Sequence, residues 1–441
     1  MRLLAGAASF VFIPIMLIGR AVYAIARRLV PVAGRGFTGL RGSYIRHINE
    51  SNIHLNQDPK ILNDIADASH VALASALCQL SACAATLNRN SRAALFPHGD
   101  ELTALLDELA KAKRFIFIEC RILRQGQVFS EIFELLEAKA IDGLDVRIAY
   151  EGWASRRFLP RGFARHAHSV GIKCRRFNTR IRGFGQYHNR FMVIIDGNSA
   201  FTSSHPDLGD ELATNQGMFR CAQLIVRGDA VWSLCLAFLN SWAILTKTEE
   251  DYTAYRPTLA YPEERGYIMA FTTDPANSSA LHTAFIKAIT SAQSYVYITT
   301  PAMAPPPQLL YALRLAAFSG IDVRILTSSA TESSLADHVT KAYYSPLLDA
   351  GVRIYEYTES MLGIQSLVTD DAFGLVSSGG MGTEKPSIAV WAFADEFVLE
   401  IRNEFLGSLE SVREVSPRAW YVAQGFPARL WHSILRTVNE Y

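Results

Sequence analysis

The chain has 441 residues, of which 49% are hydrophobic and 19% are charged. This length accommodates two ordinary domains, and the composition predicts large buried cores and some contact with a membrane. The formal net charge is +1, so the chain as a whole lacks the basic balance that is typical of nucleic-acid-binding proteins. Its six cysteines show neither a CxxC pair nor another metal-ligand spacing, which predicts reduced core thiols and no metal site.

The N-terminal segment, residues 1–35, is predicted to be a membrane anchor. An uncharged run of 17 residues begins at Leu3, and this length is close to the lower limit for spanning a bilayer. Arg27 and Arg28 follow the run whereas only Arg2 precedes it, and this bias predicts that the bulk of the chain lies in the cytoplasm. A cleaved signal peptide is the alternative, because an acceptable cleavage site lies just after the run.

Residues 36–87 are interpreted as a connecting segment and residues 88–245 as a first lobe. Its first predicted helix follows the N-cap residue Asp100, and one face of that helix is formed by Leu102, Leu105, Leu106 and Leu109. Short runs rich in β-branched and aromatic residues, at 114–119 and 145–150, predict strands. Strands that alternate with helices predict an α/β layered fold with a mostly parallel sheet.

The second half of the chain repeats the first. Four segments recur in the same order at an offset of about 180 residues, a period too long for a solenoid. The matched pairs are residues 110–120 with 290–300, 142–150 with 319–327, 170–178 with 350–358, and 194–204 with 368–378. We therefore expect two duplicated lobes, packed about a pseudo-two-fold axis, each contributing one motif to a shared cleft.

The remaining boundaries follow from this duplication. Residues 246–266 are polar and contain prolines, so they are interpreted as the linker between the lobes. The second lobe covers residues 267–415. Residues 416–441 form a C-terminal amphipathic tail, for which docking on a membrane interface and packing against the domain remain equally good interpretations.

This organisation resembles the phospholipase D superfamily, and specifically bacterial cardiolipin synthases. The resemblance rests on one strand-and-aspartate element in each half, YHNRFMVIIDG (187–197) and MLGIQSLVTDD (361–371). It also includes the segments FIFIECRIL, GLDVRIAYEGWASR and SLESVREVSPRAW, and it extends from about Asn88 to the C-terminus. An N-terminal anchor is usual in that family, so the resemblance places the protein at a bacterial inner membrane, with most of its chain cytoplasmic.

The resemblance implies a phosphatidyl transfer. In the family, each half supplies an HxKxxxxD motif, followed by a small polar turn and an asparagine. One histidine attacks the phosphorus and the other handles the proton, while the lysines neutralise the phosphate oxygens. No cofactor is implied.

This sequence departs from the family pattern at most of these positions. When each half is aligned on its aspartate, Asp196 or Asp370, the histidine and lysine positions are occupied by Asn189 and Phe191 in the first half, and by Gly363 and Gln365 in the second. The asparagine positions are lost as well. The sequence therefore predicts a family member that has lost catalysis, because losing both sets of partners removes nearly all of the rate enhancement.

Two histidines could replace the missing nucleophile. His188 and Arg190 lie one residue before the motif positions, but successive side chains on a strand point to opposite faces, so this shift turns them away. His205 lies on a loop beside a serine pair. An active phosphatidyltransferase with a rewired site using His188 or His205 remains the alternative, as does a scaffold whose cleft is filled by Phe191 and its neighbours.

The surviving motif residues have ordinary interpretations too. Asp196 and Asp370 are candidate catalytic relics, but aspartates at strand ends also make turn hydrogen bonds. The serine pairs, Ser203 with Ser204 and Ser377 with Ser378, are candidate phosphate ligands.

A basic segment suggests a binding role. Between Glu151 and Asp196 there is no acidic residue, whereas ten basic ones occur, namely Arg156, Arg157, Arg161, Arg165, Lys173, Arg175, Arg176, Arg180, Arg182 and Arg190. Such a run predicts an anionic neighbour, and beside a membrane anchor that neighbour is an anionic phospholipid surface rather than nucleic acid. An active synthase subunit or a second copy of the chain is a further expected partner.

Overall fold

The structure is a computed structural model, which describes residues 60–61, 85–96, 101–177, 189–205, 207–210, 219–248, 250–262, 266–273, 279–329, 334–381 and 387–439. The predicted anchor, nearly all of the connecting segment, and His188 lie outside the described residues. Among the described residues, no helix combines the length and the apolar character that crossing a bilayer requires.

In the described part of the chain, the first lobe is built on a seven-stranded mixed sheet with the order β1-β8-β6-β5-β2-β3-β4. Its strands are β1 (Ser91–Leu95), β2 (Phe115–Cys120), β3 (Asp145–Glu151), β4 (Lys173–Phe177), β5 (Met192–Ile195), β6 (Ser199–Ser203) and β8 (Gln223–Gly228). Its helices are α5 (Glu101–Lys111), α6 (Gln127–Ile141), α7 (Gly152–Ser155), α8 (Phe163–Ser169) and α9 (Val231–Thr246). Strands β2, β3 and β4 are parallel, and β5 runs antiparallel to β2.

The second lobe is built, over its described residues, on an eight-stranded sheet with the order β17-β12-β11-β10-β14-β15-β16-β9. Its strands are β9 (Tyr267–Thr273), β10 (Tyr295–Thr300), β11 (Asp322–Ser328), β12 (Arg353–Tyr357), β14 (Gln365–Thr369), β15 (Phe373–Ser377), β16 (Ser387–Phe393) and β17 (Val412–Glu414). Its helices are α10 (Ser279–Ser291), α11 (Pro307–Phe318), α12 (Ser334–Ala342), α13 (Tyr344–Leu348), α14 (Glu396–Ser408), α15 (Pro417–Ala423) and α16 (Phe426–Asn439).

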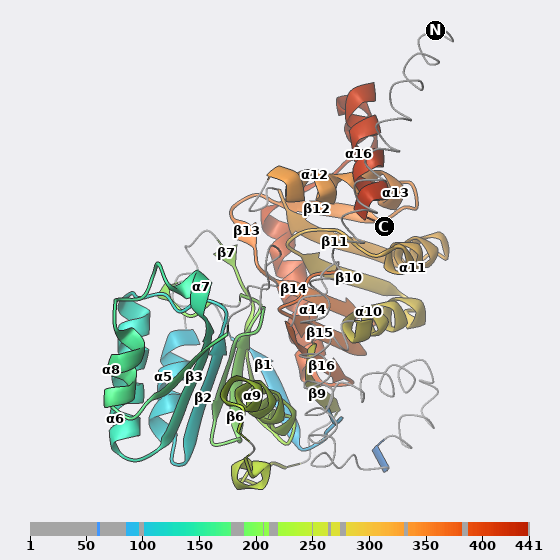
Figure 1. The fold of residues 1–441 in the computed structure, drawn as a ribbon. Helices are drawn as coiled ribbons and strands as arrows, with labels where there is room; N and C mark the ends of the chain where they lie inside the picture. Colours follow the sequence, from blue (N-terminus) through green and yellow to red (C-terminus); the bar gives the residue numbers. More distant parts are fainter. Residues whose placement is uncertain are drawn as a thin grey trace.

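The two strand orders confirm the duplicated α/β lobes. Read from β4 and from β12, the sheets run β4-β3-β2-β5-β6-β8-β1 and β12-β11-β10-β14-β15-β16-β9, so each strand of the first lobe has a counterpart in the second. Strand β17 is the addition, at the outer edge of β12. Figure 1 shows the two lobes side by side, with helices on both faces of each sheet.

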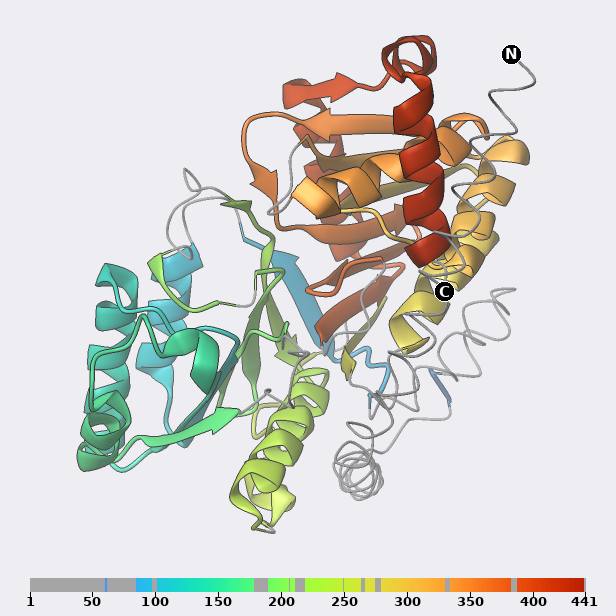
Figure 2. The same ribbon diagram turned by 45° about the horizontal axis from the view of Figure 1, so that its top comes forward.

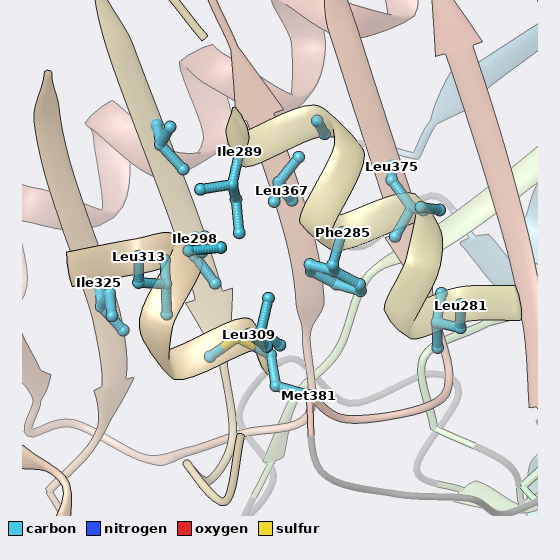
Figure 3. Packing of buried hydrophobic residues seen from close by; sticks show 14 of the residues in the cluster. Leu281, Phe285, Ile289, Ile298, Leu309, Leu313, Ile325, Leu367, Leu375 and Met381 are labelled. Carbon is cyan, nitrogen blue, oxygen red and sulfur yellow. The ribbon is translucent and has the colours of Figure 1, made fainter. Parts of the chain in front are cut away.

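Three of the four hydrophobic clusters formed by the described residues make up the lobe interiors and the contact between the lobes. The leucine face predicted for α5 is confirmed, because Leu105 and Leu109 are buried against the first sheet with α6 and α8. In the second lobe, α10 and α11 cover the corresponding face, and Figure 3 shows Phe285 and Leu313 pointing into that core. The third cluster joins the lobes, since it contains side chains of α9, α14 and both sheets.

Short backbone pairings also connect the lobes. Strand β7 (Phe219–Arg220) pairs in parallel with β13 (Met361–Leu362), so a small two-stranded sheet bridges the lobes. The C-terminal tail packs on the second lobe: the ring of Trp420 lies 4.9 Å from that of Tyr344, and α16 lies against α12. Figure 2 shows α16 (red) lying along this lobe.

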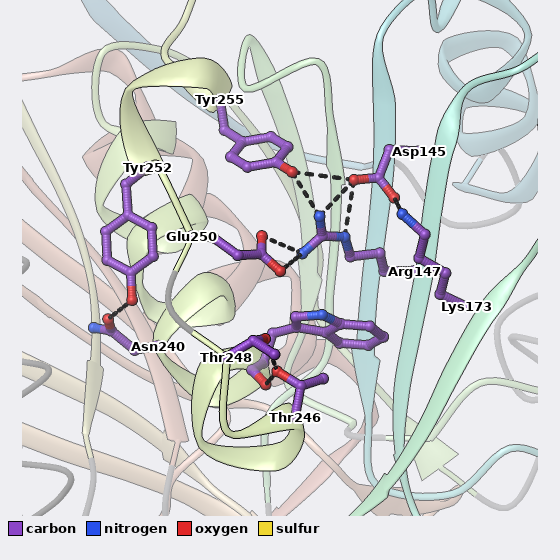
Figure 4. Close-up of polar contacts among 10 residues, drawn as sticks. Asp145, Arg147, Lys173, Asn240, Thr246, Thr248, Glu250, Tyr252 and Tyr255 are labelled. Carbon is purple, nitrogen blue, oxygen red and sulfur yellow. Dashed lines mark hydrogen bonds and ion pairs between the residues drawn. The ribbon is translucent and has the colours of Figure 1, made fainter.

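The segment between the lobes is fixed to the first lobe through Arg147. This arginine on β3 is buried, and its guanidinium donates hydrogen bonds to Asp145, Glu250 and the Tyr255 hydroxyl at 2.6–2.9 Å (Figure 4). Tyr255 lies in the 3-10 helix η2 (Tyr252–Tyr255). Burial opposes ionisation of the Asp145 carboxyl, but hydrogen bonds from Arg147 and Lys173 outweigh it and hold its pKa below the usual value.

Candidate functional site

The two motif aspartates serve as identical turn caps. The Asp196 carboxylate accepts hydrogen bonds from the three consecutive backbone N–H groups of residues 113–115, at 2.7–3.0 Å. The Asp370 carboxylate accepts from residues 293–295 at 2.7–2.9 Å. Both adopt a left-handed backbone (φ +55° and +54°), which aspartate tolerates in turns. Each aspartate therefore holds the turn that starts the neighbouring strand, β2 or β10, and the turn role accounts for its position.

In the first lobe, the residues at the family's histidine and lysine positions make structural contacts. Asn189 forms a parallel backbone bridge with Ser387 of the second lobe. Its Oδ1 is buried and has no hydrogen-bond partner in the part of the chain that the structure describes. Phe191 is 2% exposed and belongs to the first lobe's hydrophobic cluster. Neither side chain supplies a nucleophile or a cation.

In the second lobe, the residues at the family's histidine and lysine positions also make structural contacts. The Gly363 N–H donates to the Arg220 carbonyl at 2.7 Å, so this position also lies in a contact between the lobes. A Cβ at Gly363 would lie 2.7 Å from the Cys221 Sγ, which leaves no space for a histidine side chain without a rearrangement. Gln365 is 1% exposed and its Oε1 accepts from the Thr300 hydroxyl at 2.7 Å. Its Nε2 has no partner among the described residues.

Arg190 points to the opposite side of the chain from Phe191, but the expectation that it turns away from the shared cleft is wrong, because Arg190 faces the second lobe whereas Phe191 packs into the first lobe's own core. Its guanidinium is buried where the lobes meet, donates to the Thr273 carbonyl at 2.7 Å, and lies 3.5 Å from the Glu119 carboxylate. Glu119 is fully buried as well. Arg190 was a candidate lipid ligand, but this placement gives it a structural role between the lobes and no exposed surface.

His205 lies beside a carboxylate that is already paired. Its Nε2 is 3.6 Å from Asp207 Oδ2. The same carboxylate is buried and accepts two hydrogen bonds from Arg121, at 2.7 and 3.1 Å. Arg124 approaches it to 3.6 Å. An imidazole oriented by an aspartate is a usual general-base arrangement, but here two arginines share the aspartate.

The serine pairs bond to the backbone. The Ser203 hydroxyl accepts from the His205 N–H and the Ser204 hydroxyl from the Ala222 N–H, at 3.0 and 2.9 Å. In the second lobe, the Ser377 hydroxyl donates to the Ile388 carbonyl and accepts from the Gly379 N–H, and the Ser378 hydroxyl accepts from the Ile388 N–H. These contacts close the ends of corresponding strand pairs, β6 with β8 and β15 with β16.

The predicted basic surface includes an arginine-lined cavity. Arg156, Arg157, Arg161 and Arg165 are exposed, and none of them has an acidic partner in the part of the chain that the structure describes. A cavity of about 590 Å³ lies at one end of this surface; it is lined by Arg121, Ile122, Trp153, Ala154, Arg156 and Arg157, and is called the arginine pocket below. It contains the residues that follow β2 and β3, where parallel strands end and α/β proteins commonly bind ligands.

Sequence reasoning missed part of this pocket. Arg121 and Trp153 were not singled out, although each lies within three residues of the end of a predicted strand and the carboxyl ends of parallel strands meet at one edge. Of the other basic residues in the segment, Lys173 is paired with Asp145 at 2.8 Å, and Arg180 and Arg182 lie outside the described residues. Among the described residues, no group of histidine, cysteine and acidic side chains is arranged to hold a metal ion.

Comparisons with known proteins agree with this architecture. The family described as "Cardiolipin synthase, PLD-like domain" matches residues 285–406. The chain is 27% identical over 344 residues to an uncharacterised protein of Streptococcus mutans, covering 74% of each chain. It is 28% identical over 332 residues to a cardiolipin synthase of Halalkalibacterium halodurans, covering 71% of this chain and 66% of that protein.

A solved structure shares the fold. The phosphatidylserine synthase of Haemophilus influenzae superimposes with a TM-score of 0.59 at 10% identity, over 78% of this chain and 93% of the other. The same strand order in two lobes, the paired aspartate turns and these relatives agree. The chain therefore belongs to the phospholipase D superfamily, as a cardiolipin synthase-like member.

Proposed function

We propose that this protein is a catalytically inactive relative of the cardiolipin synthases, which binds the phosphate group of an anionic phospholipid at the membrane. The observation that carries the proposal is the occupation of both nucleophile positions by backbone contacts between the lobes, at Asn189 and at Gly363. Neither residue can attack phosphorus or transfer a proton. Phe191 and Gln365 offer no positive charge to a phosphate oxygen.

The arginine pocket supports the binding part of the proposal. Arg156 and Arg157 carry guanidinium groups that the described part of the chain leaves without a carboxylate, and such groups bind phosphate through paired, charge-assisted hydrogen bonds. Trp153 is 52% exposed beside them and offers an amphipathic ring at the level of lipid headgroups. A cavity of about 590 Å³ accommodates a glycerophosphate headgroup.

Localisation and partners follow as part of the same proposal. The uncharged N-terminal run and the arginines after it favour an anchor in a bacterial inner membrane, with the lobes in the cytoplasm. An active synthase subunit in the same membrane is the partner that such a protein would serve, either by presenting lipid or by holding the complex together. A second copy of this chain is the other candidate partner.

The binding proposal is tested with a soluble short-chain phosphatidylglycerol and the purified full chain. In titration calorimetry, we expect Arg156→Gln with Arg157→Gln to weaken binding by about tenfold or more, because each charge-assisted hydrogen bond contributes roughly 1.5–3 kcal/mol. The matched control is Arg161→Gln with Arg165→Gln, which removes the same charge outside the pocket and is expected to leave the affinity nearly unchanged. Equal affinities for both double variants would contradict a specific site.

An active enzyme with a rewired nucleophile is the second candidate. It is favoured by the approach of His205 to Asp207, because a carboxylate can orient an imidazole for proton transfer. Against it stands the pairing of Asp207 with Arg121, and the second lobe supplies no matching acid or cation at Gly363 and Gln365. A lipid conversion assay separates the two candidates.

A further inference from the structure

The outer surface of α11 is apolar where a solvent-facing helix is normally polar. Tyr311, Leu315 and Phe318 are 65%, 45% and 63% exposed, and their i, i+4, i+7 spacing places them on one face. The opposite face is apolar as well, because Leu309 and Leu313 point into the core of the second lobe (Figure 3). A helix that is apolar all round is normally covered on both sides. No described residue of this chain covers the outer face.

The duplication provides an internal reference for this surface. By the alignment of the two halves, Tyr311, Leu315 and Phe318 correspond to Glu134, Ala138 and Ile141 on α6 of the first lobe. The two helices cover the same face of equivalent sheets, so their inner sides meet the same packing demands. On the outer sides, Tyr311 and Leu315 stand where the first lobe has Glu134 and Ala138, and Phe318 stands where it has the exposed Ile141, so the second lobe presents the larger apolar surface. We therefore attribute the larger apolar surface of α11 to what contacts the protein from outside and not to packing within the lobe.

The helices that cover the two sheets also differ in charge. Helices α5 and α6 of the first lobe carry six acidic residues, namely Glu101, Asp107, Glu108, Glu131, Glu134 and Glu137. Helices α10 and α11 carry none, and their only formal charges are Lys287 and Arg314. The Arg314 guanidinium lies over the Phe318 ring at 5.8 Å, and it has no carboxylate partner among the described residues.

We propose that the outer face of α10 and α11 docks on the surface of an anionic phospholipid bilayer, with Tyr311, Leu315 and Phe318 immersed at the headgroup level and Arg314 beside a lipid phosphate. Exposed aromatic and aliphatic side chains beside cations, with no acid, are the pattern of interfacial helices. The attraction of an anionic surface acts on each cation within a Debye length, and a carboxylate there would oppose it. A second copy of this chain fits this face less well, because a contact of the face with itself would bring Lys287 and Arg314 beside their like-charged counterparts, and the described α5 and α6 expose Ile141 alone among their large apolar side chains.

This docking face is separate from the arginine pocket, which lies in the first lobe. It would orient the molecule with the outer side of the second lobe against the bilayer, whether or not the pocket holds a headgroup. The proposal therefore goes beyond the proposed function and does not require it. Failure of the pocket would appear with soluble short-chain lipid, where no bilayer is present, and failure of the docking face would appear only with vesicles.

The test places an environment-sensitive fluorophore at matched positions of the full chain reconstituted in phosphatidylglycerol-containing vesicles. Leu315→Cys carries the probe on the proposed face, and Ala138→Cys carries it at the equivalent position of the first lobe. The parent chain without an added cysteine gives the background of the native thiols, of which Cys221 is partly exposed and Cys120, Cys174 and Cys235 are buried. We expect a blue shift and loss of iodide quenching for the probe at position 315, and full quenching for the probe at 138.

Two further measurements decide the outcome. Tyr311→Ser with Phe318→Ser, combined with the probe at 315, is expected to restore quenching, while circular dichroism stays unchanged because both side chains face solvent. Neutral phosphatidylcholine vesicles are expected to give a smaller blue shift than anionic ones. Equal quenching of the probes at 315 and 138 in anionic vesicles would overturn the proposal. A blue shift that appears without vesicles and grows with protein concentration would assign the face to self-association instead.

Discussion

Single residues at the family's catalytic positions have structural contacts in this protein. Asp196 and Asp370 keep the same three backbone hydrogen bonds in both lobes, so the turn role alone explains their presence. The histidine positions instead became contacts between the lobes. At Gly363 the contact also excludes a side chain, because the Cys221 sulfur fills the space that one would need.

A prediction follows for Gly363→Ala. The added Cβ would meet the Cys221 Sγ at 2.7 Å, and overpacking of this kind costs about 1–3 kcal/mol of unfolding free energy. Combining it with Cys221→Ala is expected to recover part of that loss, since the two sites are coupled. Urea denaturation of the four members of this cycle measures the coupling. Gly407→Ala, in α14 with nothing within 4 Å, is the control and is expected to be neutral or stabilising.

A second prediction compares equivalent arginines of the two lobes. Arg147 is 5% exposed and contacts Asp145 and Glu250, whereas Arg324 is 23% exposed and has Asp322 as its one acidic partner within the described ranges. Arg147→Ala should destabilise by about 3–5 kcal/mol, because it removes the buried guanidinium that pairs with Glu250 and leaves Asp145 with Lys173 alone of its two cations. Arg324→Ala should cost about 1 kcal/mol or less. Similar losses for both variants, measured by urea denaturation at pH 7, would contradict this account of the cluster.

The stability difference between the parent chain and Arg147→Ala is expected to depend on pH. The pKa of the Asp145 carboxyl is lowered in the folded protein, so its contribution is present above the usual value of 3.8 and is lost as the pH falls below it. The difference between the parent chain and Arg147→Ala should therefore shrink in acid.

The attachment of the C-terminal helix α16 involves a histidine that titrates near neutral pH. The His432 imidazole stacks on Trp420 and bonds to the Gln424 amide at 3.2 Å. Burial lowers the pKa of His432, and His338, Arg436 and Lys341 lower it further, whereas Asp337 opposes them. The neutral ring is therefore the form that fits between α12 and α16.

Acid is predicted to loosen α16. Because the folded pKa of His432 lies below the unfolded value of 6.5, its stabilising contribution is complete above that pH and decreases as the pH falls below it. Hydrogen exchange over residues 424–439 should be faster at pH 5.5 than at pH 7.5, after correction for the intrinsic rate. His432→Gln should remove most of this difference, and an unchanged pH response in that variant would refute the assignment.

The elements also show what a sequence can and cannot predict here. The strands β2, β3, β10 and β11 were predictable, because each is a short run of β-branched and aromatic residues that recurs in the second half. Side-chain alternation placed Arg190 and Phe191 on opposite sides, but it assigned the side that faces the second lobe to the wrong residue, since Arg190 contacts Thr273 and Phe191 enters the first lobe's core. The expectation of an anchor stays a prediction, because residues 1–35 lie outside the described ones.

What the sequence could not show depends on packing between distant segments. Arg190 meets Glu119 and Thr273 only because the lobes associate, and no local pattern connects these residues. The same holds for Cys221 against Gly363, and for the pairing of Arg121 with Asp207 that limits His205. The exposed face of α11 was likewise missed, because its apolar residues look like core residues until the sheet shows which side they take.

In the whole molecule, the two duplicated lobes share one fold but differ in their outer surfaces. The lobes keep one strand order and one set of aspartate turns, and a shared hydrophobic cluster joins them. The first lobe carries the arginine pocket and acidic outer helices, whereas the second carries an acid-free, apolar outer face. The fold of a phosphatidyl-transferring family is thus retained while the region between the lobes serves to hold them together.

The proposed absence of phosphatidyl transfer is tested most directly by a lipid conversion assay. Purified full chain is incubated in phosphatidylglycerol-containing vesicles, and cardiolipin and phosphatidic acid are followed by mass spectrometry beside an active cardiolipin synthase. We predict no turnover above the protein-free background, in the parent chain and in His188→Ala and His205→Ala alike. Cardiolipin formation by the parent chain that is abolished by either substitution would contradict the claim and identify the nucleophile.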